Sequence, residues 1–385
     1  MSLTLQILIG VWRAVLLLPD AELPFNFDLK RHGEKYSMVI FNGKEMIETD
    51  HAALVGDSVF FHLPVFESEF RLKVDAKTMD GNWINYSRKG NPAIAFHATY
   101  GDRKRFDFVK PATVNATGRW ETWFDASTPD SSLAIGVFDQ KGNKVTGTFL
   151  TSSGDHRFLE GSVTENEMWL STFDGSHCWL YKAVIKGDEM EGTFWSGNHY
   201  KSSWHAKRNE KIFLPDPFSV TSVNQPLKFS FPDAEGKIVS LSDERFKNKA
   251  VIIQILGSWC PNCLDETAFL NKYYSDNKDR GIEVIGLAFE KTPDFQRASA
   301  NIKRLQTRFN VQYPMLIAGV VGKEEVMKKL QGVQNFSSYP TTIYINKSGK
   351  VEKVYSGFSG PATGVEYEKY KVEFEETVKK LLLKE

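Results

Sequence analysis

The chain has 385 residues, of which 41% are hydrophobic and 25% are charged, and its 48 Lys and Arg residues balance 48 Asp and Glu residues. This composition is ordinary for globular proteins, suits two or three domains and excludes an intrinsically disordered chain. No basic arm or stripe stands out, which argues against nucleic acid as the main partner.

The first apolar stretch is LTLQILIGVWRAVLLL, which contains Arg13. Its roughly 15 apolar residues are too few to span a bilayer, and it lacks the basic start of a secretory signal. We therefore expect it to belong to a folded domain. MSL followed directly by domain-like sequence is also what a removed signal peptide or lipid anchor would leave behind, so the sequence leaves that origin open.

Residues 1–208 are predicted to form an all-β domain of two tandem copies, about 9–105 and 117–208. Three segments recur at a constant offset of 108 residues: GVW at 10–12 and GRW at 118–120, FRLKV at 70–74 opposite CWLYK at 178–182, and FHA at 96–98 and WHA at 204–206. A constant offset over such a span indicates a duplicated unit.

Each copy consists of short alternating segments separated by turn signals, such as KRHGEKYSMVIFNGKEM and FDQKGNKVTGTFLTSSGD. Closely spaced turns of this kind predict antiparallel meanders. Two copies that close on each other into one up-and-down barrel of about ten strands would leave no open sheet edges. A sandwich of two sheets is the alternative.

Two groups of residues in this domain are candidates for binding. His97 and His205 occupy equivalent repeat positions, although equivalent packing explains them as well. Asp174, His177 and Cys178 lie within five residues of one another, but DGS is an ordinary turn signal and Cys178 is expected to be a small buried strand residue rather than a reactive thiol.

A linker is predicted at 209–226, where prolines at 215, 217 and 226 follow the end of the repeat. Prolines at this density indicate a semi-rigid connection. The C-terminal domain is then expected to cover 227–385.

The stretch QILGSWCPNCLDE, Gln254 to Glu266, holds two of the three cysteines. A structural zinc site needs four Cys or His ligands, yet no second pair follows and all eight histidines come earlier in the chain, so we expect no metal. A structural disulfide would close a loop too short to constrain the unfolded chain much, which favours a redox pair.

The flanking sequence places this pair at a strand-to-helix turn. Val251–Leu256 is a continuous apolar run typical of a buried strand, Gly257 and Ser258 end it, and a helical pattern runs from Leu264 to Gly281. The start of a helix stabilises a thiolate. Cys260, the outer thiol, is therefore the expected nucleophile, and Cys263 the thiol that resolves the mixed disulfide.

Strands and helices alternate through the rest of the chain. Strand patterns occur at 281–290, 313–319, 341–346 and 350–357, and helical patterns at 294–309, 323–330 and 365–384. This alternation predicts an α/β sheet covered on both faces.

GSWCPNC followed by SSYPTTIYINKSGKV resembles the thioredoxin fold and is most similar to the TlpA/ResA-like thiol-disulfide oxidoreductases, over about residues 218–385. The resemblance implies a cis-proline at Pro340 and a substrate groove formed by Trp259, Pro261, Tyr339 and Pro340. It implies no bound cofactor other than a redox-active Cys260–Cys263 disulfide. Tyr339 has a second interpretation, in which it only packs.

The resemblance also maps an acidic residue three positions after the second cysteine onto Glu266. One interpretation gives Glu266 a general acid/base role toward Cys263, one helical turn away. The other is that a carboxylate near a helix N-terminus only interacts favourably with the helix dipole. Pro261-Asn262 differs from the Gly-Pro of thioredoxin, and such residues tune redox direction, which the sequence does not fix.

The leading hypothesis is a reductase of protein disulfides. The resemblance implies substrates such as cysteine pairs awaiting haem attachment, a membrane thiol donor and a bacterial extracytoplasmic location. The β domain would present targets to Cys260 or pair two chains into a homodimer. A thiol peroxidase is one alternative, although the residues around Ser258 do not match the peroxiredoxin pattern, and a β-barrel that binds a ligand or partner beside an accessory redox domain is another.

Overall fold

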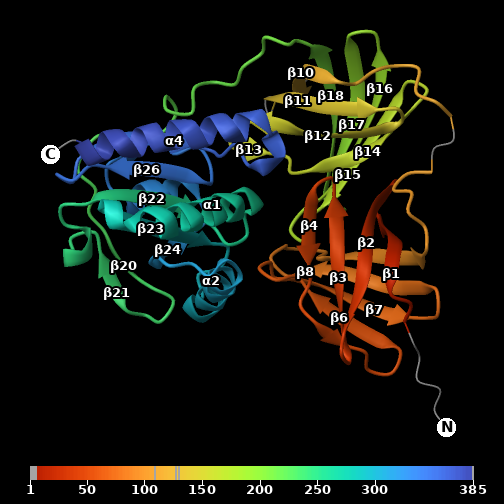
Figure 1. Ribbon diagram of the computed structural model, residues 1–385, viewed down its shortest axis with the longest axis horizontal. Helices are drawn as coiled ribbons and strands as arrows, with labels where there is room; N and C mark the ends of the chain where they lie inside the picture. Colours follow the sequence, from red (N-terminus) through yellow and green to blue (C-terminus); the bar gives the residue numbers. More distant parts are fainter. Residues whose placement is uncertain (1–6, 108–109, 126–127, 129–130, 384–385) are drawn as a thin grey trace. The chain divides into compact units, whose positions relative to one another are not determined.

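The computed structural model describes residues 7–107, 110–125, 128 and 131–383. The chain divides into two compact units, which are described one at a time (Figure 1). The N-terminal unit comprises Met1–Phe149 and His156–Phe213, and the C-terminal unit comprises Leu150–Asp155 and Leu214–Glu385.

The first copy of the repeat forms one antiparallel sheet with the strand order β4-β3-β2-β1-β9-β8-β7-β6, in which β5 pairs with β3. Its strands β1 to β9 are Gly10–Leu17, Glu22–His32, Lys35–Asn42, Glu45–Glu48, Ala52–Ala53, Ser58–His62, Ser68–Val74, Thr78–Asn85 and Ala93–Tyr100. Within the apolar stretch around Arg13, residues 10–17 thus form strand β1 of a folded domain, and residues 3–6 lie outside the described part of the chain.

The second copy forms a second sheet, ordered β11-β10-β18-β17-β16-β15-β14-β12-β13. Its strands β10 to β18 are Gly118–Phe124, Ser132–Lys141, Lys144–Thr151, Gly154–Asp155, Leu159–Thr164, Glu167–Phe173, Cys178–Lys186, Glu189–Ser196 and Tyr200–Arg208. Because β11 also pairs with β12, eight of these strands close into a barrel.

The two copies share their strand register at the offset seen in the sequence. Trp12 lies opposite Tyr100 in the β1/β9 pair, and Trp120 lies opposite Arg208 in the β10/β18 pair. Both tryptophans are fully buried, and each indole N–H donates to the carbonyl oxygen four residues earlier, at 3.0 Å and 2.9 Å.

The predicted all-β antiparallel domain and its barrel are confirmed, but closure differs from our expectation of one barrel of about ten strands built from both copies. Each copy forms its own sheet, and the second closes on itself through the β11/β12 pair. The two copies meet through a shared core, in which Phe173 of the second copy stacks on Phe25 of the first with ring centroids 4.9 Å apart.

Arg105 is a buried cation that joins the two copies. Its guanidinium donates to the Phe41 carbonyl at 2.8 Å and to Asn42 Oδ1 at 3.0 Å on the first sheet, and to Ser171 Oγ at 2.8 Å and Ser171 O at 3.2 Å on the second. Burial lowers the pKa of Arg105 to about 10, although the negative charge of Glu160 acts in the other direction and raises it. A buried charge is tolerated because its hydrogen bonds are made.

The C-terminal unit is the expected α/β domain. Its main sheet has the order β24-β23-β22-β26-β27, with β22, β23 and β24 parallel and β26 and β27 antiparallel. Strands β19 to β27 are Ser222–Val223, Ser230–Pro232, Ile238–Ser240, Ala250–Leu256, Ile282–Glu290, Met315–Val320, Val333–Gln334, Thr341–Ile345 and Val351–Ser356.

The α-helices of this unit are α1 (Pro261–Asn277), α2 (Phe295–Phe309), α3 (Lys323–Lys329) and α4 (Val365–Leu383), with short 3-10 helices at Glu244–Phe246, Lys278–Arg280 and Pro361–Thr363. Helices α1 and α4 pack together through Phe269 and Phe374, whose ring centroids are 4.9 Å apart. The predicted strands and helices of this region are all present.

The connection between the units differs from the predicted linker at 209–226. Strand β18 ends at Arg208, the C-terminal unit begins again at Leu214, and β19 pairs with β25 inside that unit. Residues 214–226 therefore belong to the C-terminal unit, whose start we expected at 227. No sequence signal indicated that residues 150–155 belong to it as well.

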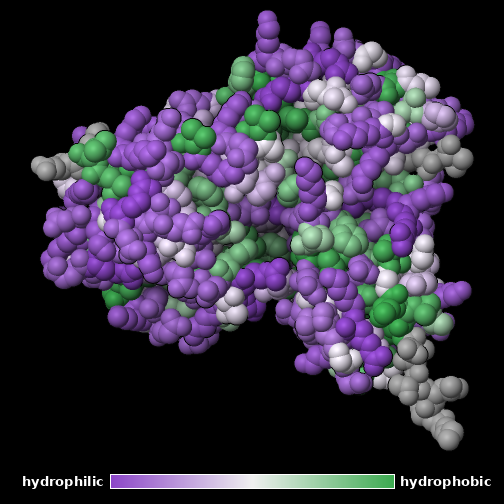
Figure 2. All heavy atoms as spheres, in the orientation of Figure 1, coloured by the Kyte–Doolittle hydropathy of each residue, from purple (hydrophilic) through white to green (hydrophobic). Residues whose placement is uncertain are grey.

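Hydrophilic residues predominate on the visible face of each unit, and hydrophobic residues gather there in small groups (Figure 2). Among the described residues, no helix combines the length and the apolar character that a membrane crossing requires.

Replacing Arg105 should destabilise the N-terminal unit. In Arg105→Met the Phe41, Asn42 and Ser171 oxygens lose their buried donor, so we expect the free energy of unfolding to fall by about 3 to 5 kcal/mol. Urea unfolding followed by tryptophan fluorescence measures this, because eight of the nine tryptophans precede residue 209. Exposed Arg103 is the matched control, and Arg103→Met should change the value by less than about 0.5 kcal/mol. Equal losses in the two variants would contradict the bridging role.

Candidate redox site

The two cysteines lie where β22 turns into α1. All seven residues of β22 are buried, and α1 begins at Pro261, whose missing N–H costs nothing at the first helical position. Cys260 is the N-cap residue and forms a disulfide with Cys263, with Cα atoms 5.2 Å apart. Cys260 is 7% exposed and Cys263 is fully buried, so Cys260 is the more accessible sulfur.

Cys260 Sγ lies among groups that favour negative charge. The Cys263 backbone N–H donates to this sulfur at 3.2 Å, and the sulfur sits at the N-terminus of α1. The unpaired N–H groups and the helix dipole both stabilise a thiolate there.

The predicted groove residues surround this sulfur. The Tyr339–Pro340 peptide bond is cis, as the resemblance implies, and the Tyr339 carbonyl oxygen lies 3.9 Å from Cys260 Sγ. Trp259 packs edge-on against Tyr339 at 5.4 Å between ring centroids, and its indole N–H donates to the Phe289 carbonyl at 2.9 Å. Pro261 is buried at the start of α1.

Glu266 is fully buried beneath the redox turn, one helical turn beyond Cys263. Thr342 donates a hydrogen bond to Glu266 Oε1 at 2.6 Å, and the Tyr370 hydroxyl on α4 donates to the same oxygen at 3.3 Å. Burial raises the pKa of Glu266 to about 7, while Thr342, Gln254 and Tyr370 lower it by less. The carboxyl group is therefore divided between its two protonation states near neutral pH.

Gln254 and Thr342 form a cross-strand pair in the β22/β26 ladder. Gln254 Nε2 donates to the Cys263 carbonyl at 3.1 Å, and Thr267 donates to Gln254 Oε1 at 3.0 Å. This pair ties the sheet to the first turns of α1. Sequence reasoning missed both residues, although a glutamine inside the apolar run VIIQIL was the available signal.

Glu290, at the end of β23, is a second buried carboxylate that sequence reasoning missed. It accepts hydrogen bonds from Ser258 N at 2.8 Å, Ser258 Oγ at 2.7 Å and Asn301 Nδ2 at 3.2 Å. These bonds hold the backbone just before Cys260. The signal was a charged residue that follows the apolar run VIGLAF at the end of the predicted strand.

Asn262, between the cysteines, contacts the segment 150–155 of the same unit. Its side-chain Nδ2 donates to the Asp155 carbonyl at 3.1 Å, and Asp155 Oδ2 accepts from Gly360 N at 3.0 Å. The CPNC turn is thus joined to a segment that precedes it by more than 100 residues.

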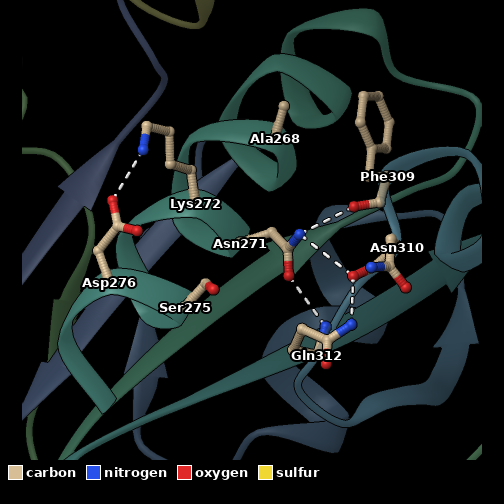
Figure 3. Close-up of a pocket in the computed structure, with 8 residues that line it drawn as sticks. All are labelled: Ala268, Asn271, Lys272, Ser275, Asp276, Phe309, Asn310 and Gln312. Atoms are coloured by element: carbon tan, nitrogen blue, oxygen red, sulfur yellow. Dashed lines mark hydrogen bonds and ion pairs between the residues drawn. The ribbon is translucent and has the colours of Figure 1, made fainter. Parts of the chain in front are cut away.

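A pocket of about 550 Å³ lies beside α1 and the end of α2 (Figure 3). None of the predicted site residues lines it, and its polar groups bond to one another: Asn271 Nδ2 donates to the Phe309 carbonyl at 2.8 Å, and Gln312 N donates to Asn271 Oδ1 at 2.9 Å. Its lining residues are Ala268, Asn271, Lys272, Ser275, Asp276, Phe309, Asn310 and Gln312.

Of the candidates in the N-terminal unit, Asp174 and His177 are in contact, with His177 Nδ1 3.1 Å from Asp174 Oδ2, but His97 and His205 are not brought together. His97 on β9 contacts Asp80 at 2.7 Å, whereas His205 lies exposed on β18 in the other sheet. Asp174 is buried and accepts from the backbone of Ser176 and His177, as expected of a turn. Cys178 is fully buried, and burial raises its pKa to about 11, which makes it a poor nucleophile.

Comparisons with known proteins identify relatives of the C-terminal region. Residues 223–354 match the model of the AhpC/TSA family. The thiol-disulfide oxidoreductase ResA of Bacillus thuringiensis (strain Al Hakam) is 27% identical over 139 residues, which cover 36% of this chain and 72% of that protein. ResA of Bacillus subtilis (strain 168) is 24% identical over 139 residues, which cover 36% of this chain and 69% of that protein.

Among solved structures, a putative thiol:disulfide interchange protein DsbE from Chlorobium tepidum matches 43% of this chain and 99% of its own, at 18% identity and a TM-score of 0.33. The predicted resemblance of the C-terminal region to thioredoxin-like, TlpA/ResA-like proteins is confirmed by the family match and the curated relatives.

The raised pKa of Glu266 predicts a pH-dependent stability. The folded state keeps the Glu266 proton up to about pH 7, whereas the unfolded chain loses it near pH 4.5, so stability falls as pH rises through this window and stays low above it. Between about pH 5 and about pH 8, the free energy of unfolding of the oxidised protein should fall by about 2 to 3 kcal/mol. The free energy of unfolding of Glu266→Gln should not show this fall.

Urea unfolding followed by circular dichroism at the helical band measures this loss, because α1 to α4 all belong to the C-terminal unit. Asp265→Asn removes the charge of the adjacent residue on α1. Its stability should depend on pH as that of the unmodified protein does. The same slope in Glu266→Gln as in the unmodified protein would show that Glu266 is not the titrating group.

Proposed function

We propose that this chain, whose C-terminal region is thioredoxin-like and TlpA/ResA-like, reduces protein disulfides through the Cys260–Cys263 pair. The thiol-disulfide oxidoreductase activity follows from its relatives. The reductive direction and the mixed-disulfide route are our proposal. One observation carries it: the more accessible sulfur caps α1, beside a cis-proline and above a buried carboxyl group with a pKa near 7.

In the first step the Cys260 thiolate attacks one sulfur of a substrate disulfide. A bond forms between Cys260 Sγ and that sulfur, the substrate S–S bond breaks, and the other substrate sulfur leaves as a thiolate that takes up a proton. The helix N-terminus and the Cys263 N–H support the attacking thiolate.

In the second step Cys263 attacks Cys260 Sγ, which closes the Cys260–Cys263 disulfide and releases the second substrate thiolate. Two electrons have then passed from the dithiol to the substrate. Cys263 is fully buried and must lose a proton before it attacks, so a base close to it is required.

Glu266 is suited to take that proton. It lies one helical turn from Cys263, and a pKa near 7 lets it both accept and return a proton at neutral pH. Thr342 and Tyr370 hold one carboxyl oxygen in place, and Gln254 fixes the Cys263 backbone.

The groove beside Cys260 is suited to an extended peptide. Tyr339 and Pro340 present backbone next to the sulfur, and Trp259 forms an aromatic wall with Lys291 Nζ 5.1 Å from its ring centroid. We therefore propose protein substrates, such as cysteine pairs awaiting haem attachment.

The oxidised pair must be reduced again by an external thiol donor that supplies two electrons. Following the resemblance, we propose that this donor is membrane-bound and that the protein works outside the bacterial cytoplasm. We propose for the β domain a role in presenting targets or in pairing two chains.

Removing either active-site thiol should abolish turnover in different ways. Cys260→Ser leaves no nucleophile and should not react with a disulfide substrate. Cys263→Ser should form the mixed disulfide and stop there, because nothing resolves it. Reduction of a disulfide substrate in the presence of dithiothreitol measures turnover, and intact-protein mass spectrometry detects the trapped adduct.

Cys178→Ala is the control and should keep full activity, because that thiol is fully buried within the N-terminal unit. Full activity in Cys260→Ser, or peroxide consumption in place of disulfide reduction, would refute the proposal. The direction of electron transfer is tested by measuring the reduction potential of the Cys260–Cys263 pair in glutathione and dithiothreitol buffers. A reduction potential near or below about −200 mV fits a reductase, and one near about −120 mV fits an oxidant.

Glu266→Gln should slow the second step. We expect the resolution rate of the unmodified protein to rise with pH through about 7, as Glu266 loses its proton, and the rate of the variant to be about 100-fold lower at neutral pH. Rapid-mixing release of a labelled thiol from the mixed disulfide measures this step. Asp265→Asn should keep the original profile, and an unchanged profile in Glu266→Gln would remove Glu266 from proton transfer.

A further inference from the structure

Three potential metal ligands meet on the first sheet of the N-terminal unit, in a region that the redox chemistry does not use. His32 Nε2 lies 3.4 Å from Glu48 Oε1, and His51 Nε2 lies 3.9 Å from the same oxygen. The ligand atoms of all three residues lie within 4.8 Å of one another. Within the part of the chain that the structure describes, this is the one such group of three.

The strand register, and not only side-chain orientation, brings this group together. In the order β4-β3-β2, His32 on β2 pairs with Lys35 on β3, and Glu48 on β4 pairs with Val39 on β3. Positions 35, 37 and 39 of β3 share one face because side chains alternate along a strand. His32, Ser37 and Glu48 therefore lie on one face of three neighbouring strands.

His51 completes the group from the segment between β4 and β5. It follows Glu48 by three residues, and the next residue, Ala52, is fixed by its pairing with Tyr36 on β3. The His32 and His51 rings stack with centroids 4.0 Å apart and an interplanar angle of 12°. Both imidazoles thus present Nε2 toward the same carboxylate.

Ser37 holds the carboxylate in place. Its hydroxyl is fully buried and donates to Glu48 Oε1 at 2.7 Å, and its oxygen also lies 3.0 Å from His32 Nε2. The Ser37 hydrogen bond, more than the nearby cations, holds the pKa of Glu48 below its ordinary value. An ionised carboxylate fixed by an outer hydrogen bond is the usual arrangement of a metal ligand.

We propose that His32, Glu48 and His51 bind one divalent transition-metal ion, of the Zn²⁺ or Cu²⁺ class, through the two Nε2 atoms and a carboxylate oxygen. Tetrahedral ligands at about 2.1 Å from zinc lie about 3.4 Å apart. The His32–Glu48 distance already fits, the His51–Glu48 distance must shorten by about half an ångström, and the two Nε2 atoms, which lie within 4.8 Å of each other, must reach the same separation. Two imidazoles select such ions over Ca²⁺ and Mg²⁺.

The surroundings shape the proposed affinity. All three side chains are partly exposed, so water can take the remaining coordination position, as in sites with three protein ligands. Lys30 lies opposite Ser37 on the same face, and its charge opposes a bound cation. Binding should therefore depend on both imidazoles, and the loss of either one should weaken it.

The unit also contains a matched control. His97 lies 2.7 Å from Asp80, which gives an exposed imidazole–carboxylate pair without the second imidazole. If exposed pairs of this kind were sufficient, His97→Gln would reduce metal binding as much as His32→Gln or His51→Gln.

The experiment is titration of the full-length, oxidised protein with Zn²⁺ and with Cu²⁺ by calorimetry, with the Cys260–Cys263 disulfide closed so that the thiols do not compete. We expect one ion per chain, at least about tenfold weaker binding in His32→Gln and in His51→Gln, and no change in His97→Gln. Electron paramagnetic resonance of the Cu²⁺ form should show two coordinated nitrogens, reduced to one in either variant.

A folding control accompanies the titration. Without metal, the variants should melt within a few degrees of the unmodified protein, and added Zn²⁺ should raise the melting temperature of the unmodified protein and of His97→Gln but not of His32→Gln or His51→Gln. Absence of binding at millimolar metal, or binding that neither substitution weakens, would overturn the proposal.

Discussion

The redox site depends on the desolvation of Glu266. A carboxyl group at the first turns of an exposed helix would be ionised at neutral pH and would only interact with the helix dipole. Here the carboxyl group lies between Thr342 on β26 and Tyr370 on α4, which packs against α1, so it is fully buried and its pKa rises to about 7. Of the two interpretations of Glu266 that the sequence left open, this environment favours the acid/base role.

The rest of the site follows from how that burial is achieved. Gln254 and Thr342 lie opposite each other in the sheet and bond upward to Cys263 and Glu266. Glu290 fixes Ser258 on the approach to Cys260. The turn that carries the cysteines is therefore held by Glu290 at the end of β23 and by Gln254 in the sheet, while Tyr339 lies beside Cys260.

Local signals in the sequence predicted much of this unit. The apolar run before Gly257, the helical spacing after Leu264 and the Cys-x-x-Cys pair identified the strand, the helix and the two thiols, because each pattern reports on neighbours along the chain. The partners of Glu266 were beyond reach, since Thr342 and Tyr370 follow it by 76 and 104 residues. Only the folded sheet and α4 bring them together.

Contacts between residues far apart in the sequence also explain why the closure of the N-terminal unit was not predicted. The offset of 108 residues indicated two copies, but whether sheets close within one copy or between two depends on long-range strand pairs such as β11/β12, which periodicity does not encode. Arg105 in KRFDF and the three residues His32, Glu48 and His51 carried no spacing signal either. Their roles depend on which strands are neighbours.

Arg105 and Glu266, two of the buried ionisable residues of this protein, show how packing separates a structural role from a chemical one. Arg105 is buried with four hydrogen bonds to fixed oxygens, and even with a lowered pKa of about 10 it keeps its charge at neutral pH. Glu266 is also buried, but both of its hydrogen bonds reach Oε1, and among the described residues none reaches Oε2. A satisfied charge stabilises one state of the fold. A half-satisfied carboxyl group has two states of similar free energy, and that near-equality is what a proton acceptor beside Cys263 requires.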